Sequence, residues 1–268
     1  MWTEANMHLS KLVPELRMAA AEQLRAARRK PCPLFIGMVL AINLILILIY
    51  PVASFMHGLH WISFDKAAFW HEFSVASDGS VPEVAGYLQL AAAAAAMAVL
   101  AVKSGARTYF SWVIILAYAI ADDSLLIHEL AGAKLAQFFP GTWGPQGLFV
   151  GELIYFATTG AFLALIFAYS YVQSERKHRA RSVLLLLPFG MLAFFAVLFD
   201  YFRESIRGIS RLADFFVGMI EDGSELLCMS IIMLLAIGLV IASSGETVAL
   251  ERFSGVVAHR VSPSVDWP

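Results

Sequence analysis

The sequence predicts an all-α membrane protein, a bundle of six transmembrane helices with both termini in the cytoplasm and a short amphipathic N-terminal arm. Hydrophobic residues make up 59% of the 268 residues and charged residues only 15%, whereas soluble domains have about half and about a quarter. The apolar residues also collect into runs of about 20, which as a helix cross roughly 30 Å of hydrocarbon. A third feature, the distribution of lysine and arginine, gives the orientation.

The first 32 residues are the predicted arm. Basic residues such as Lys11 and Arg17 alternate there with apolar ones such as Leu12 and Leu16, a pattern typical of a helix that lies on anionic lipid. Pro14 indicates two short helices or a kink. Residues 33–243 follow as one transmembrane domain, and residues 244–268 are predicted to be a cytoplasmic tail.

Six apolar runs define the spans. They cover residues 34–56, 84–102, 108–129, 149–172, 183–203 and 215–242. Ser80 and Glu83 precede the second run at the spacing of a capping box, so a helix should begin there. Six consecutive alanines, from Ala91 to Ala96, lie in the same run. Their small side chains favour close approach of a neighbouring helix.

Lysine and arginine are distributed unevenly between the two sides of this topology. The termini and the connections 103–107 and 173–182 hold 14 of these residues, and the opposite connections hold five. Cytoplasmic loops are enriched in Lys and Arg, so both termini are expected inside, in a cell (inner) membrane. The outer connection 57–73, with His57, His60 and His71 among aromatic residues, is expected to lie in the membrane interface.

The acidic residues are concentrated on the other side. Of 21 Asp and Glu residues, 14 lie on the predicted outer side or in the outer ends of spans. Asp122 and Asp123 are roughly 9 Å inside the outer surface at about 1.5 Å per residue. A charge within an apolar span is costly and indicates function. Eight acids from four spans are the predicted site: Asp122, Asp123, Glu129, Glu152, Asp200, Glu204, Glu221 and Glu225.

Helical periodicity divides these residues by face. At 100° per residue, Tyr118, Asp122 and Glu129 share one face of a continuous third span. Asp123 and His128 then point away from that face on opposite sides. Only one of these two residues is therefore expected to join a common pocket with Asp122.

A divalent metal ion is the predicted occupant of the acid cluster. Crowded carboxylates cannot all ionise in low dielectric without a cation or a shared proton, and carboxylates with an imidazole suit hard or borderline ions. His128, Asp122 and Glu129 are the candidates for catalytic acid–base residues. Acids at helix ends also mark the water boundary or complement a helix dipole, which is the alternative interpretation.

Three arginines follow the fifth span at intervals of four residues. Arg203, Arg207 and Arg211 lie close in sequence to Asp200 and Glu204. Their guanidinium groups could clamp a phosphate, or they could form a solvated, salt-bridged helix end.

Three functions remain open at this point, because the sequence does not establish whether the protein is an enzyme. The first is a metal-dependent enzyme that acts on a lipid or lipid-linked substrate, for which the arginines would bind phosphate. The second is a non-catalytic accessory or sensor subunit, whose acids pair with the arginines or with a partner. The third is a cation- or proton-coupled transporter. Membrane lipid is an expected partner, nucleic acid is not, and the oligomeric state is left open.

Overall fold

The computed structural model describes residues 32–138, 147–199, 201–203 and 211–261, together with Pro14, Arg17 and Ala21. Most of the predicted N-terminal arm therefore lies outside the described residues. Within the described ranges all regular structure is helical, which confirms the predicted all-α class.

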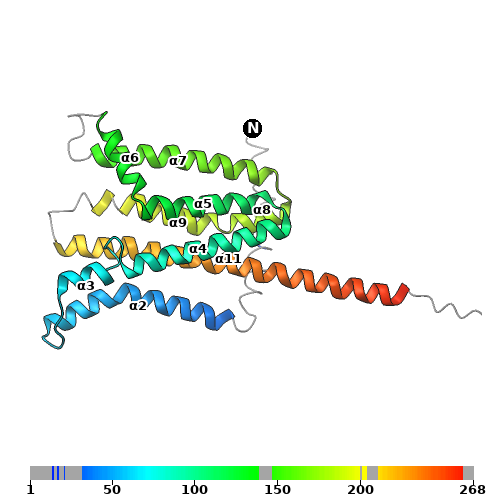
Figure 1. Ribbon diagram of the computed structural model, residues 1–268, viewed down its shortest axis with the longest axis horizontal. Coiled ribbons are helices and arrows are strands. Elements are labelled where there is room, and N and C mark those ends of the chain that lie inside the picture. The colour runs from blue at the N-terminus through cyan, green and yellow to red at the C-terminus, as the bar shows by residue number, and fades with distance from the viewer. Residues whose placement is uncertain are drawn as a thin grey trace, which may run out of the picture.

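Ten helical elements follow one another along the described chain (Figure 1). They are α2 (Cys32–Gly58), α3 (Lys66–Phe73), α4 (Val81–Ser104), α5 (Arg107–Ser124), α6 (Ile127–Ala136), α7 (Gly147–Val172), α8 (Arg176–Val183), α9 (Leu186–Phe194), the π-helix η2 (Phe195–Phe199) and α11 (Arg211–Val261).

Five helical segments are long and apolar enough to cross a membrane. They are Pro33–Gly58, Val81–Ser104, Gly147–Val172, Arg176–Arg203 and Ala213–Ser244. A sixth is counted if α5 and α6, which meet at 68°, form one bent span. The apolar runs of the sequence coincide with these segments to within a few residues, except that the run predicted at 183–203 begins earlier, at Arg176. α11 continues to Val261, so a helix extends into the part predicted as a tail.

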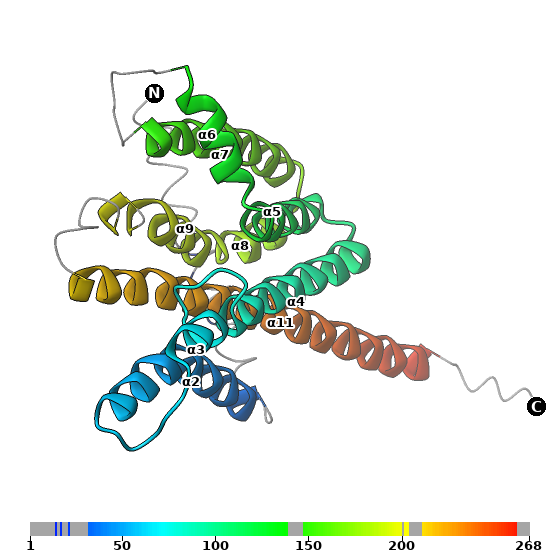
Figure 2. The same cartoon turned by 60° about the vertical axis from the view of Figure 1, so that its left-hand side comes forward.

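α11 lies at the centre of the arrangement. It packs against α4, α9, η2 and α2, while α5 packs on α4, and α6 packs on α7 at the edge (Figures 1 and 2). The core between α4, α5 and α11 is closed by side chains without solvent exposure, among them Met97, Trp112 and Ile232. Only 11% of the apolar windows of α2 and of α7 is buried, as expected for helices that face lipid.

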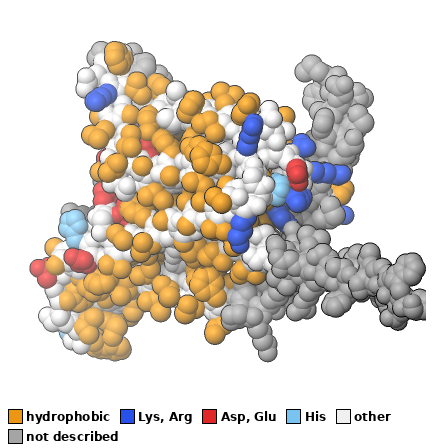
Figure 3. Space-filling view, turned by 45° about the vertical axis from the view of Figure 1, so that its right-hand side comes forward, with side chains coloured by type: hydrophobic (Ala, Val, Ile, Leu, Met, Phe, Trp, Pro, Cys, Tyr) orange, Lys and Arg blue, Asp and Glu red, His pale blue; other side chains and the backbone are white. Residues whose placement is uncertain are grey.

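The two ends of the bundle differ in charge. At one end, termed the acidic end, lie Asp78, Glu83, Asp122, Asp123 and Glu221. At the other, termed the basic end, lie Lys103, Arg107, Arg176, Lys177 and Arg179. Figure 3 shows red atoms toward one side of an apolar surface and most of the blue atoms toward the other.

The predicted capping box at the start of α4 forms. Ser80 Oγ accepts a hydrogen bond from the Glu83 backbone N–H at 3.5 Å, and Pro82 occupies the first turn. The Glu83 carboxylate accepts from the backbone N–H of Gly79, the residue before the N-cap, so the second bond of the capping box is displaced by one residue. This local structure fixes Glu83 at the acidic end.

The third span is not continuous, contrary to the prediction for residues 108–129. α5 ends at Ser124, and α6 begins at Ile127 with a bend of 68°. Leu126 adopts a left-handed conformation with φ +50°, and the Leu125 N–H bonds back to Ala121 and Asp123 carbonyls. Leucine normally favours helix, so the Leu125-Leu126 pair gives no sequence signal of this break.

Three polar side chains join α2, α4 and α11 within the apolar interior. Gln89 Nε2 donates to Asn43 Oδ1 at 2.8 Å, Ser230 Oγ donates to Gln89 Oε1 at 2.7 Å, and Asn43 Nδ2 donates to Ser230 Oγ. Asn43 and Ser230 are fully buried. Interhelical hydrogen bonds of this kind stabilise packing in lipid, so this ring of bonds holds α2 to the central helices.

Candidate functional site

A cavity of about 110 Å³ opens at the acidic end, between the start of α4, the end of α5 and residues 222–229 of α11. Its charged lining consists of five carboxylates and one guanidinium, a formal excess of four negative charges: Asp78, Glu83, Asp123, Asp222, Glu225 and Arg203. Gly86 and Met229 form part of its apolar lining. We term this cavity the acidic pocket.

Arg203 is the cation of the acidic pocket. Its Nε lies 3.4 Å from Asp214 Oδ1, and its Nη1 lies 3.6 Å from Glu221 Oε2 and 3.9 Å from Asp222 Oδ2. The guanidinium rests on Gly218, where an added Cβ would lie 3.0 Å from Arg203 Cζ. Arg203 thus connects the end of the apolar segment Arg176–Arg203 to three acids between residues 214 and 222 of α11.

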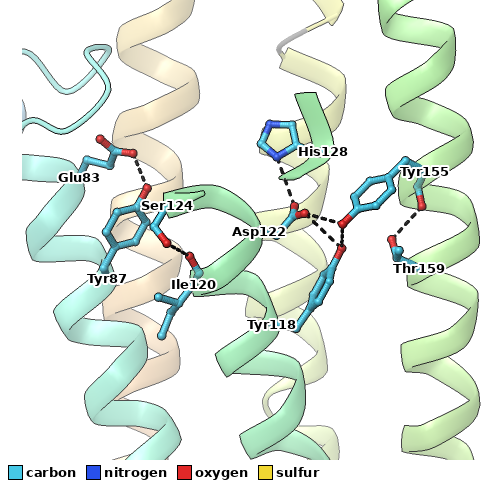
Figure 4. A network of polar contacts seen from close by, with 9 residues as sticks. All are labelled: Glu83, Tyr87, Tyr118, Ile120, Asp122, Ser124, His128, Tyr155 and Thr159. Carbon is cyan, nitrogen blue, oxygen red and sulfur yellow. Dashed lines mark hydrogen bonds and ion pairs between the residues drawn. The ribbon is translucent and has the colours of Figure 1, made fainter. Parts of the chain in front are cut away.

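The α4 side of the pocket is formed by Pro82, Glu83 and Gly86, and Tyr87 lies one helical turn after Glu83. The Tyr87 hydroxyl donates to Glu83 Oε1 (Figure 4). It also interacts with Asp123 of α5. One phenol therefore bridges two carboxylates of the lining.

Asp122 belongs to a second cluster, on the side of α5 that faces α7. Asp122 Oδ1 accepts hydrogen bonds from Tyr155 at 2.7 Å and Tyr118 at 3.3 Å, and the two hydroxyls are 2.7 Å apart. Asp122 Oδ2 lies 3.3 Å from His128 Nδ1, and the imidazole stacks on Phe156. Figure 4 shows His128 and the two tyrosines converging on Asp122. We term these four residues (Asp122, His128, Tyr118 and Tyr155) the Asp122 network.

The Asp122 network corrects the predicted placement of His128. Continuous helical periodicity directs His128 away from Asp122, but the bend between α5 and α6 brings the imidazole back onto the carboxylate. The predicted pairing of Tyr118 with Asp122 on one face is confirmed by their hydrogen bond. Asp123, the next residue, lines the acidic pocket instead.

The remaining predicted site residues are dispersed. Glu129 is exposed, while Glu152 is buried against Gly132 of α6. Glu221 is buried beside Arg203, and Glu225 lines the acidic pocket. Asp200, Glu204 and Arg207 lie outside the described residues, and Arg211 is the first residue of α11.

The predicted metal cluster is not supported in the described part of the chain. No group of three His, Cys, Asp or Glu side chains there converges closely enough to hold an ion. The reason is geometric, because α5 separates the Asp122 network from the acidic pocket, and Arg203 occupies the space between three of the remaining acids. Of the predicted phosphate clamp, only the Arg203 side chain belongs to the described part of the chain, and it lies beside three carboxylates.

The three histidines of the connection 57–73 do not line the acidic pocket. His57 Nδ1 lies 3.2 Å from the Ile62 carbonyl oxygen, and His71 Nδ1 lies 3.4 Å from Ser77 Oγ. Their contacts order the connection between α2 and α4.

Sequence reasoning missed Glu83 and Tyr87 as members of a site. Both were detectable in principle, because the Ser80 cap fixes Glu83 at the start of α4, at the acidic end, and Tyr87 follows one turn later on the same face. Ser77 and Asp78 enter the lining through the loop geometry before α4, which carries no pattern of its own.

Tyr155→Phe is expected to destabilise the protein by about 1.5 kcal/mol, because it removes a 2.7 Å hydrogen bond to the Asp122 carboxylate. Thermal unfolding in detergent measures the effect. Tyr169→Phe is the matched control, since Tyr169 lies on the same helix with 65% of its surface exposed. Equal unfolding midpoints for the two variants would contradict a structural role for the Asp122 network.

Comparison with protein families gives one match. The model of a family described as a domain of unknown function (DUF8692) matches residues 34–241. The chain belongs to the DUF8692 family. No curated protein and no solved structure matches it significantly. The DUF8692 match extends from the first turns of α2 into α11, so it includes both the acidic pocket and the Asp122 network.

Proposed function

We propose that this DUF8692 protein is a multi-pass protein of the cell (inner) membrane that binds a divalent cation reversibly in the acidic pocket on the outer side, as a non-catalytic sensor or accessory subunit. The observation that carries the proposal is the lining of the pocket, which brings five carboxylates together with a single guanidinium.

The proposed topology has six crossings with both termini in the cytoplasm. α2 begins at the basic end, and α11 returns to that end after the acidic one, which requires an even number of crossings. Six result when α5 and α6 count as one bent span. The basic end is assigned to the cytoplasm because Lys and Arg are enriched in cytoplasmic loops, and the acidic pocket then faces outward.

Charge and size of the pocket both support a small cation. Carboxylates crowded into a partly buried space repel one another unless a cation or a proton intervenes, and the single Arg203 leaves four charges in excess. The volume of about 110 Å³ is well below the roughly 300–1,000 Å³ of pockets for larger organic ligands. Hard divalent ions prefer carboxylate and water oxygens, so a partly hydrated ion fits this lining.

Reversible binding is favoured over a permanent metal centre. No preformed chelate exists among the described residues, and Arg203 already lies within ion-pair distance of Asp222, a lining residue. An incoming cation would therefore compete with Arg203 for carboxylate. Arg203 joins the apolar segment Arg176–Arg203 to α11. Such competition would therefore change the contact between this segment and α11.

The alternative is an enzyme that acts on a lipid or lipid-linked substrate, and the Asp122 network favours it. A carboxylate that orients an imidazole is a common general-base arrangement, and Asp122 lies 3.3 Å from His128. A transporter is the other alternative, supported by the bend between α5 and α6, since interrupted helices occur at transport sites. The closed core around Met97 and Ile232 argues against a continuous path.

The test is a cation titration of the full-length protein, purified in detergent and stripped of metal with a chelator. Ca²⁺ or Mg²⁺ is expected to raise the thermal midpoint saturably, and Na⁺ at equal ionic strength is not. Asp123→Asn should weaken the apparent affinity about tenfold, equivalent to about 1.4 kcal/mol, because Asp123 lines the pocket.

Glu72→Gln is the control, since Glu72 is exposed on α3 and is absent from the lining. It removes the same charge at the same end of the bundle. An identical cation response in Asp123→Asn and Glu72→Gln would reject the pocket as the binding site. Absence of any divalent response in the wild type would reject the proposed function and shift attention to the Asp122 network.

A further inference from the structure

A second charged surface lies at the opposite end of the bundle and is independent of the acidic pocket. The end of α4, the start of α5 and the segment 173–183 with α8 carry six cations, of which Arg181 is buried, and a single acid, Glu175: Lys103, Arg107, Arg176, Lys177, Arg179 and Arg181. Figure 3 shows blue side chains gathered at this end of the apolar surface. From this surface we infer that α8 is an interfacial helix that binds the phosphate of an anionic phospholipid headgroup.

The first support is that α8 is rigidly docked. Its Ser182 Oγ accepts hydrogen bonds from Thr108 Oγ1 and Trp112 Nε1, both at 2.7 Å. His178 Nδ1 lies 3.1 Å from the Tyr109 hydroxyl. Ser182, His178 and Arg181 are buried, so this face of α8 is fixed on the start of α5. A helix held in this way offers its other face as a preorganised surface, which lowers the entropic cost of binding.

The second support is the state of Arg179 on that surface. Its guanidinium carbon lies 5.7 Å from the centre of the Tyr171 ring, a cation–π contact that orients the fork at the end of α7. The Arg179 Nε is buried and has no hydrogen-bond partner within the described residues. A buried N–H donor favours an acceptor, and phosphate oxygens match the guanidinium fork.

The third support is the position of α8 at the edge of the apolar surface. Large exposed apolar side chains lie beside the cations in the sequence: Val102 next to Lys103, Phe110 one turn after Arg107, and Val172 four residues before Arg176. Lys177 is exposed, and its Nζ lies 3.8 Å from Glu175 Oε2. Cations at the boundary of an apolar surface are at the level of lipid headgroups, where anionic lipids attract them. This placement favours a lipid over a soluble anion.

The experiment compares the full-length protein in nanodiscs of phosphatidylcholine with and without phosphatidylglycerol, using the thermal midpoint. The anionic lipid is expected to raise the midpoint of the wild type, and Arg179→Gln should roughly halve that increase. Lys177→Gln, a change at an exposed position that should not impair folding, is expected to reduce it as well. Lys134→Gln is the matched control, because Lys134 is exposed on α6 at the acidic end.

Full retention of the lipid effect in both Arg179→Gln and Lys177→Gln would overturn the inference. Inorganic phosphate added to phosphatidylcholine nanodiscs is expected to have no effect. If it raised the midpoint as phosphatidylglycerol does, the ligand would be a soluble anion, and the lipid assignment would be overturned. Neither result depends on cation binding in the acidic pocket.

Discussion

Gly151→Ala is expected to destabilise the protein by about 2–3 kcal/mol, as measured by thermal unfolding in detergent. α6 and α7 touch through their backbones at this position. A Cβ at Gly151 would lie 2.9 Å from the Gly132 carbonyl carbon, 3.1 Å from the Ala136 backbone nitrogen, and closest of all to the Gly132 carbonyl oxygen. No side-chain rotation relieves contacts with backbone, so the two helices must separate.

Gly160→Ala on the same helix is the matched control, because a Cβ there meets nothing within 4 Å. Both variants gain the higher helix propensity of alanine, about 1 kcal/mol, so their difference isolates the steric effect. Gly132→Ala should be intermediate, since part of its clash is with the flexible Glu152 side chain. Equal stability of Gly151→Ala and Gly160→Ala would show that α6 is not docked on α7 as described.

The glycines also illustrate what the sequence can predict. Gly147 and Gly151 have the spacing of a small-residue packing motif, and both are buried. Gly132 and Ala136 form the facing pair, because Gly147 approaches Ala136 and Gly151 approaches Gly132. This motif was readable from the sequence, but its partner helix was not, since α6 becomes a separate element only through the break after Ser124.

Span positions followed from hydrophobicity alone, because an apolar run of membrane length has few alternatives to a helix. The candidate site was harder to predict. Which acids meet depends on the break at Leu126, a left-handed leucine without a glycine or proline signal. That one feature pairs His128 with Asp122, whereas Asp123 lines the acidic pocket together with four other carboxylates. Periodicity could assign faces within α5, but it could not extend them across the bend.

Arg203→Gln is the variant with the second largest expected effect, a loss of about 2 kcal/mol in metal-free buffer. Three acids would lose their common cation: Asp214, Glu221 and Asp222. Removing one partner of a fully buried ion pair costs about 3–5 kcal/mol. The Arg203 side chain is 26% exposed, so solvent screening reduces the expected cost.

A divalent cation should then restore more stability to Arg203→Gln than it adds to the wild type, because the tethered competitor is gone. The thermal midpoint with and without Ca²⁺ measures both effects.

Asp222→Asn in the Arg203→Gln background should recover part of the lost stability by reducing repulsion within the pocket. Lys134→Gln, which removes an exposed cation at the same end, should change the stability little. If Arg203→Gln lost no more stability than Lys134→Gln, Arg203 would not hold the apolar segment Arg176–Arg203 to α11. If Arg203→Gln lost the full expected stability and no divalent cation restored it, Arg203 would be a structural counter-ion and the acidic pocket would not be a cation site.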